Sequence, residues 1–161
     1  MNEIALRKPP ALAKTETRQF VTITIDGQSF GIPVLLVHDV LGPQRITRIP
    51  LAPAEVAGSL NLRGRIVTAI DIRRRLGMRP RPADAAPMSV VVEEGGELYS
   101  LLVDAVGEVL TLPESDYERH PPTMDLQWRE NSTGIYRLNG QLLVVLDVSR
   151  LLAIGSRAEA A

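Results

Sequence analysis

Residues of the types that carry catalysis are sparse in this 161-residue chain. It has two histidines and no cysteine, which excludes thiolate chemistry and disulfide bonds. His38 is followed directly by Asp39, and an aspartate can orient a catalytic histidine. Neighbouring residues on a helical turn point to different faces, however, and no recognisable nucleophile or glycine-rich phosphate loop accompanies this pair. We therefore expect His38 at the surface, and a chain without catalytic residues, metal site or cofactor.

Basic and acidic residues are distributed unevenly, although the formal net charge is only -1. Residues 63–81 contain seven arginines and one aspartate, and residues 93–118 contain eight acidic residues and no lysine or arginine. Such runs are usually solvated faces, and the alternative is that opposite charges steer similar modules together head to tail. The arginines also raise the alternative of a nucleic-acid-binding β-barrel. Single-strand binders use stacking aromatics, and none lies between Phe30 and Tyr99, so we expect no nucleic-acid partner.

The other predicted elements are arranged around residues 58–76. The apolar, β-branched run at residues 66–70 is bounded by Gly64 and Asp71, which indicates a buried strand rather than a helix. Gly64 predicts a tight turn before this strand. After it, Asp71 predicts a single helical turn, because its carboxylate can accept hydrogen bonds from the first free N–H groups. No nucleophile or metal-ligand cluster lies in this stretch, which favours binding over catalysis.

This stretch occurs twice in the sequence. A shift of 76 residues aligns six identical residues without a gap, including the pairs Gly58/Gly134 and Asp71/Asp147. A second similarity, at an offset of 69, aligns residues 30–41 with residues 99–110 and keeps the apolar rhythm. Together the similarities predict a duplicated β module. Because their offsets differ, the two halves are free to exchange strands.

Regular turn signals divide the chain into about ten predicted strands with scattered helical turns. We therefore predict an all-β fold of two small, partly closed barrels packed together. Near the central stretch we predict a helical turn at residues 35–41, a strand at residues 44–49, and a helical turn at residues 54–57 that ends at Gly58. The longest strong apolar run, residues 142–146, is too short to span a membrane.

The folded domain is predicted over residues 18–152, with two pseudo-repeated barrel subdomains. The segments on either side are polar and show no hydrophobic period. Residues 1–17 and residues 153–161 are therefore predicted to be disordered tails.

Several motifs resemble those of the CheW family of bacterial chemotaxis coupling proteins. The most specific is Asn-Leu-Arg-Gly at residues 61–64, followed by an apolar strand and Asp71. Other stretches agree with the family and are less specific on their own: residues 30–34, 102–106, 133–134 and 142–148. The resemblance covers residues 18–152, nearly the whole predicted domain.

The resemblance implies two five-stranded, SH3/OB-like barrels and an adaptor without catalysis. Members of this family hold the CheA histidine kinase, through its regulatory domain, to the cytoplasmic tips of methyl-accepting chemoreceptors. Similar contacts join CheW and CheA barrels into rings. The expected location is therefore the cytoplasm, in association with membrane-anchored receptor arrays. A scaffold for a different kinase or receptor system is the alternative.

By matching position, the receptor groove of the family implies five partner-binding residues, which are Val37, Gly58, Asn61, Arg63 and Val109. An apolar groove with a few polar anchors suits a helical partner. Each residue also has a structural explanation: the valines as core, Gly58 as a backbone requirement, Asn61 as a partner of local backbone groups, and Arg63 as a solvated side chain. The sequence departs from the family at His38 and Asp39, where many members carry glutamine or arginine with glutamate, so partner choice at that rim is open.

Overall fold

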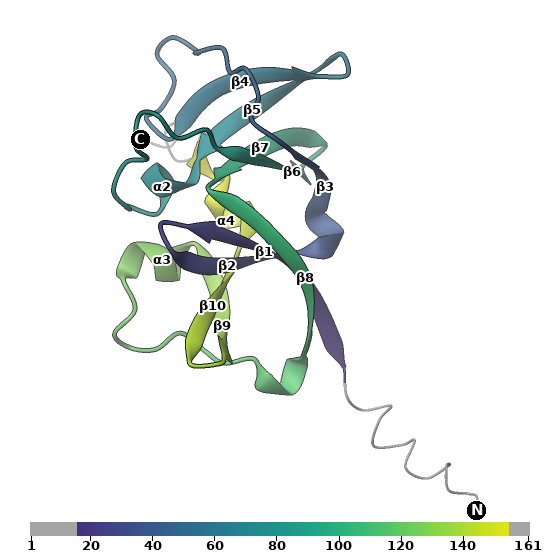
Figure 1. The fold of residues 1–161 in the computed structure, drawn as a ribbon, viewed down its shortest axis with the longest axis vertical. Coiled ribbons are helices and arrows are strands. Elements are labelled where there is room, and N and C mark those ends of the chain that lie inside the picture. The colour runs from purple at the N-terminus through teal and green to yellow at the C-terminus, as the bar shows by residue number, and fades with distance from the viewer. Residues whose placement is uncertain (1–15, 155–161) are drawn as a thin grey trace, which may run out of the picture.

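Ten strands in residues 16–154, the part of the chain that the computed structural model describes, form two five-stranded sheets (Figure 1). Sheet A has the order β8 (Ala105–Pro113), β1 (Thr17–Ile25), β2 (Gln28–Pro33), β10 (Gln141–Leu146) and β9 (Ser132–Leu138). Sheet B has the order β3 (Val37–Leu41), β6 (Met88–Glu94), β7 (Glu97–Val103), β5 (Arg65–Asp71) and β4 (Val56–Leu62). Short helices lie in the connections: η1 (Val34–Leu36), α2 (Ile72–Arg75), η2 (Glu114–Asp116), α3 (Leu126–Glu130) and α4 (Val148–Leu151). The predicted class, all-β with two five-stranded units and short helical turns, is confirmed.

Strands from both ends of the chain meet in sheet A, whereas residues 37–103 supply the whole of sheet B. Figure 1 shows sheet B in the upper half of the molecule and sheet A in the lower half. Each sheet contains one parallel pair, in which Val144 lies beside Phe30 in sheet A and Thr68 lies beside Tyr99 in sheet B. The two pairs correspond to each other in the sequence, because Thr68 and Val144 are 76 residues apart and Phe30 and Tyr99 are 69 residues apart. The two sequence similarities therefore mark equivalent strands in an equivalent register.

Hairpin turns with positive φ close the equivalent pairs β4–β5 and β9–β10. Arg63 and Gly64 have φ angles of 51° and 86°, and Asn139 and Gly140 have φ angles of 49° and 82°. Turns of this left-handed kind match the right-handed twist of the strands that they join. The tight turn predicted at Gly64 is confirmed. Arg63 holds a backbone conformation that asparagine, its equivalent in the other half, adopts more readily.

Aspartates begin the two equivalent helices after β5 and β10. The Asp71 carboxylate accepts a hydrogen bond from the Arg74 N–H at 3.4 Å, and the Asp147 carboxylate accepts one from the Arg150 N–H at 3.2 Å. These bonds satisfy backbone donors that have no partner within so short a helix. The helical turn and cap predicted at Asp71 are confirmed, and the duplicate at Asp147 repeats them.

Residues 35–41 do not form the predicted helical turn. Only Val34–Leu36 is helical, as the 3-10 helix η1, and β3 begins at Val37. This short apolar stretch fits either periodicity, so its partner decides the outcome. Pairing with β6, where Val37 lies opposite Val92, makes it a strand.

Residues 44–49 and 54–57 also differ from the predictions made for them. The first segment contains no strand, and Thr47 instead makes an isolated bridge to Ser59 at 2.8 Å in both directions. The second contains no helix, since β4 already begins at Val56 and Gly58 lies inside it. The bridge accounts for the first difference, because it holds Thr47 beside the edge of β4. Pairing of Val56 with Ile70 of β5 accounts for the second, because it extends β4 into residues 54–57.

One hydrophobic cluster crosses both sheets and includes Ile23 from sheet A and Ile70 from sheet B. Arg75 of α2 is buried beside it and donates hydrogen bonds to the backbone oxygens of residues 150 and 151, at 2.8 and 2.9 Å. Ile154 packs against the same cluster, so the packed chain continues past residue 152. The remainder of the two predicted tails, residues 1–15 and 155–161, lies outside the described residues.

Charged side chains connect the β1–β2 turn of sheet A to α2 and the loop that follows it. Arg73, with only 6% of its side chain exposed, lies 2.6 Å from the Asp104 carboxylate, which also accepts a hydrogen bond from the Asp26 N–H at 2.7 Å. Arg79 binds the Asp26 carboxylate through two hydrogen bonds of 2.9 and 2.8 Å. Arginines of the basic stretch thus pair with aspartates inside the same chain, including Asp104 of the acidic stretch.

These contacts alter the acidity of both carboxyls. The hydrogen bond from Arg79 lowers the pKa of Asp26 below its ordinary value of 3.8. Burial raises the pKa of Asp104, but the hydrogen bonds from Arg73 and the Asp26 N–H, together with nearby positive charge, outweigh it and bring that pKa below 3.8 as well. Both groups are therefore held in their charged form.

Candidate protein-binding site

Arg63 lies at the tip of the β4–β5 hairpin, and 72% of its side chain is exposed. Its guanidinium lies 3.0 Å from the carboxylate of Asp39 on β3, the opposite edge strand of sheet B. The pair therefore brings together the two edges of the sheet at the surface. Because an exposed ion pair contributes little to stability, this arginine remains available for a partner.

Asn61 precedes Arg63 on the same hairpin and is exposed. Its side-chain oxygen accepts a hydrogen bond from the Gly64 N–H at 3.0 Å, across the turn. This contact matches the structural explanation considered for Asn61, which is the satisfaction of a local backbone group. The same bond fixes the turn that presents the Arg63 side chain.

Gly58 is a backbone requirement of β4. Its φ angle of 151° is one that residues with a side chain rarely adopt. A Cβ atom at this position would collide with the carbonyl oxygen of Thr47 and would lie 2.7 Å from the Ile46 side chain. The glycine thereby allows the connection from β3 to approach β4 and to form its bridge.

The two valines lie in different sheets. Val37 begins β3, is partly buried and packs against the main hydrophobic cluster. Val109 lies on β8, an edge strand of sheet A, and is 50% exposed. The structure therefore brings Asn61, Arg63 and the edge strand that begins at Val37 together in sheet B, whereas Val109 belongs to the neighbouring sheet.

Exposed apolar side chains near the Arg63–Asp39 pair were not predicted from the sequence. Val40 follows Asp39 on β3 and is 40% exposed, and Ile66, which pairs with Asn61 across the hairpin, is 69% exposed. This part of sheet B therefore carries both an exposed ion pair and exposed apolar side chains, which is the mixed composition of a protein-binding surface. The apolar run at residues 66–70 was predicted to be buried as a whole, although the turn predicted at Gly64 places its first residue, Ile66, near the hairpin tip, where it is exposed.

The adjacent histidine and aspartate do not form a catalytic pair. Asp39 binds Arg63, while the His38 ring lies 4.0 Å from Glu93 at the surface. Within residues 16–154, no group of three or more histidine, aspartate or glutamate side chains is placed to hold a metal ion. No helix among these residues is long and apolar enough to cross a membrane.

Comparison with known proteins gives the same family throughout. A family model described as a CheW-like domain matches residues 19–155. The chemotaxis protein CheW of Klebsiella aerogenes is 29% identical over 140 residues, covering 87% of this chain and 84% of that protein. The chemotaxis protein CheW of Rhizobium meliloti is 26% identical over 143 residues, covering 89% of this chain and 92% of that protein.

A solved structure agrees with these sequence matches. The crystal structure of the scaffolding protein TtCheW from Thermoanaerobacter tengcongensis is similar, with a TM-score of 0.73 and 29% sequence identity, over 82% of this chain and 90% of that one. The family model spans both sheets and every residue of the candidate site. The chain therefore belongs to the CheW-like domain family.

Proposed function

We propose that this protein is a non-catalytic chemotaxis scaffold that joins the regulatory domain of a CheA-type histidine kinase to the cytoplasmic tips of methyl-accepting chemoreceptors. The observation that carries the proposal is the match to a CheW-like domain over residues 19–155, essentially the whole described fold. Relatives that bear the name chemotaxis protein and a solved scaffolding protein of the same fold support the adaptor role. The identities of the partners, a CheA-type kinase and chemoreceptors, are part of this proposal.

The proposed receptor-binding surface comprises Val37, Gly58, Asn61, Arg63 and Val109. Arg63 supplies an exposed cation, and Val109 supplies exposed apolar area. Gly58 and Asn61 act indirectly, since the first allows the backbone contact beside β4 and the second fixes the turn. A helical receptor tip would bury its apolar side chains here and use the arginine to fix its register.

The proposed location follows from these partners: the protein is cytoplasmic and associates with membrane-anchored receptor arrays through the kinase and the receptors. Contacts with further CheW or CheA barrels would extend it into rings. A scaffold that serves a different kinase or receptor system is the second candidate, because Asp39 and His38 form the rim where the sequence departs from the family.

Binding to two purified partners tests the proposal directly. The protein is immobilised and incubated with a CheA regulatory domain and a receptor-tip fragment from the same organism, separately and then together. We expect each to bind alone and both to bind together. If the folded protein retains neither partner, the coupling role is wrong, and the same assay with other kinases of the organism tests the second candidate.

Charge reversal at Arg63 tests the binding surface. We expect Arg63→Glu to fold normally, because the side chain is exposed, and to weaken co-sedimentation with receptor arrays. Arg137→Glu is a matched control, since Arg137 lies on the corresponding β9–β10 hairpin and forms an equally short surface ion pair of 3.0 Å with Glu118. Equal retention of both variants by the arrays would count against a contact at Arg63.

A further inference from the structure

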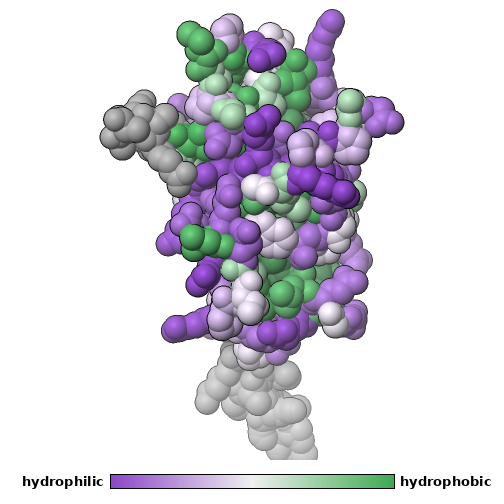
Figure 2. Space-filling model, turned by 90° about the vertical axis from the view of Figure 1, so that its left-hand side faces the viewer, coloured by the Kyte–Doolittle hydropathy of each residue, from purple (hydrophilic) through white to green (hydrophobic). Residues whose placement is uncertain are grey.

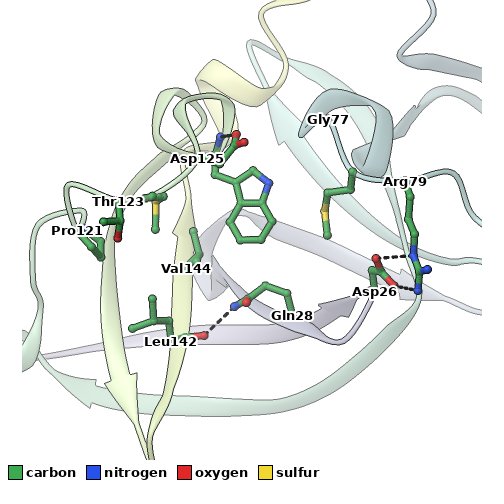
Figure 3. A pocket seen from close by; sticks show the side chains of 12 residues that line it. Asp26, Gln28, Gly77, Arg79, Pro121, Thr123, Asp125, Leu142 and Val144 are labelled. Atoms are coloured by element: carbon green, nitrogen blue, oxygen red, sulfur yellow. Dashed lines mark hydrogen bonds and ion pairs between the residues drawn. The ribbon is translucent and has the colours of Figure 1, made fainter.

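A second concave site lies between the β1–β2 turn, the loop after α2, the segment around α3, and β10. It has a volume of about 530 Å³, which is within the range of small-molecule sites. Figure 2 shows this side of the molecule, where apolar surface is interrupted by hydrophilic residues, and Figure 3 shows the pocket itself. It shares no residue with the proposed receptor-binding surface.

Apolar walls of the pocket come from an aromatic ring and two thioethers. Trp128, Met78 and Met124 line it, and each also packs against the main hydrophobic cluster. Thioethers are flexible and make favourable contacts with aromatic rings, so two of them beside an indole suit a flat apolar guest. The floor is completed by Leu142 and Val144 of β10.

The tryptophan is held firmly in place. Its indole makes an edge contact with the Phe30 ring, with centroids 5.4 Å apart. The Asp125 carboxylate caps α3 by accepting from the N–H groups of Gln127 and Trp128, and the Gln127 amide donates to the Arg75 oxygen at 2.8 Å. A wall held by β2 on one side and by α2 on the other does not need to be ordered when a ligand binds, which favours affinity.

Two of the charged groups that line the pocket face each other. Arg79 binds both oxygens of Asp26, as the dashed lines in Figure 3 show, so together they present little net charge to a ligand. The third, Asp125, accepts hydrogen bonds from the N–H groups that begin α3. The Gln28 amide nitrogen donates to the oxygens of Ser29 and Leu142, both at 2.8 Å. The indole N–H of Trp128, by contrast, has no hydrogen-bond partner among the described residues and is free to donate to a guest.

We infer that this pocket binds a small, uncharged, planar aromatic molecule that carries a hydrogen-bond acceptor. The thioethers and the indole contact its faces and edges, and the indole N–H donates to its acceptor. This inference goes beyond the scaffold role and does not depend on it.

The chain contains a single tryptophan, so one indole N–H resonance reports the pocket directly in a nitrogen-15 NMR spectrum. The full-length protein is titrated with coumarin, a planar uncharged molecule with an acceptor carbonyl, and separately with naphthalene, which lacks one. We expect coumarin to move the indole resonance saturably and naphthalene to bind more weakly. A shift that stays linear in coumarin concentration would overturn the inference.

Substitutions of the methionines that line the pocket test whether coumarin binds there. Met78→Ala and Met124→Ala are each expected to weaken coumarin binding roughly three- to tenfold. Met88→Ala is the matched control, because Met88 is also a partly buried methionine on the main cluster but lies outside the pocket. Equal weakening by all three variants would mean that general loosening of the core, and not the pocket, is responsible.

Two further outcomes are decisive. In Trp128→Phe, followed through the ligand signals, coumarin should lose its advantage over naphthalene, and a retained advantage would exclude the indole N–H as donor. Leu51 is fully exposed on the β3–β4 connection and has a φ angle of 62°. Such an exposed apolar side chain could enter the pocket of a second copy of the chain. In that case the indole resonance would shift with protein concentration in the absence of ligand, and the shift would disappear in Leu51→Ser. That result would also overturn the inference.

Discussion

Because glycine has no side chain, Gly58 allows the backbone of Thr47 to approach the edge of sheet B within the proposed receptor-binding surface. The carbonyl oxygen of Thr47 occupies the space that a Cβ atom would fill. Gly64, only six residues away, has open space around it and needs glycine only for its φ angle of 86°. The two glycines therefore separate a steric requirement from a conformational one.

Alanine at these two positions should have unequal effects. We expect Gly58→Ala to lower the free energy of unfolding by at least about 2 kcal/mol, because the collision adds to the backbone strain. Gly64→Ala should cost about 1 kcal/mol, from the left-handed conformation alone. Urea unfolding followed by circular dichroism measures both. Equal costs would show that the contact with Thr47 relaxes freely.

Residues that act within their own hairpin were predictable, and those that act across the sheet were not. Gly64 as a turn residue and Asn61 as a partner of nearby backbone groups both follow from local chemistry. The partner of Arg63 does not, because Asp39 lies 24 residues earlier and meets it only when the edges of sheet B come together. The five site residues remain a proposal that binding measurements must test.

At the scale of elements, duplication made most of the strands predictable. Equivalent pairings and equivalent caps recur in both sheets because the same local signals recur in the sequence. Helix α3 had no such signal. Its five residues are too few to be stable alone, and it is held by the contact of Trp128 with Phe30 and the hydrogen bond from Gln127 to Arg75.

The cap of α4 can be tested without changing its surroundings. We expect Asp147→Ala to lower the free energy of unfolding by about 1 kcal/mol, because the Arg150 N–H loses its acceptor. Asp147→Asn removes the charge but keeps a capping oxygen, so it should cost only a few tenths of that amount. Thermal melting compares the two. The Asp147 carboxylate also lies 3.6 Å from the Arg150 guanidinium. If asparagine costs as much as alanine, this ion pair matters more than the cap.

At the scale of the whole molecule, ion pairs and a shared core hold the two sheets together. Arg73 and Asp104 are paired in a largely buried position, and the main cluster draws residues from both sheets. The sequence showed the basic and acidic stretches but not that some of their members neutralise each other within the chain. Those pairs depend on the packing of one half against the other, which charge counting does not reveal.

Stability should therefore fall in acid. The pKa of both Asp26 and Asp104 is lower in the folded chain than the ordinary value of 3.8, so the unfolded chain binds more protons near that pH. Their contribution is present above pH 3.8 and is lost as the pH falls further, through the folded values. Urea unfolding at a series of pH values measures this slope.

Asp26→Asn should flatten the acid dependence and lower stability at neutral pH, because the bidentate pair with Arg79 is lost. Asp84→Asn, on an exposed stretch of the loop after α2, serves as the control and should leave the slope unchanged. If the free energy of unfolding falls with pH equally steeply in Asp26→Asn and in the unaltered protein, the Asp26 carboxylate does not contribute to the loss of stability in acid.

The exchange of strands also sets an order of events during synthesis. Sheet B is complete once residue 103 has left the ribosome, whereas sheet A requires β10, which ends at Leu146. β1 has β2 and β8 as its neighbours, whereas the outer edge of β2 has to wait for β10. Until residue 146 has been made, this edge of β2 is unpaired and open to other chains, so slower synthesis of residues 104–146 would lengthen the period of greatest aggregation risk.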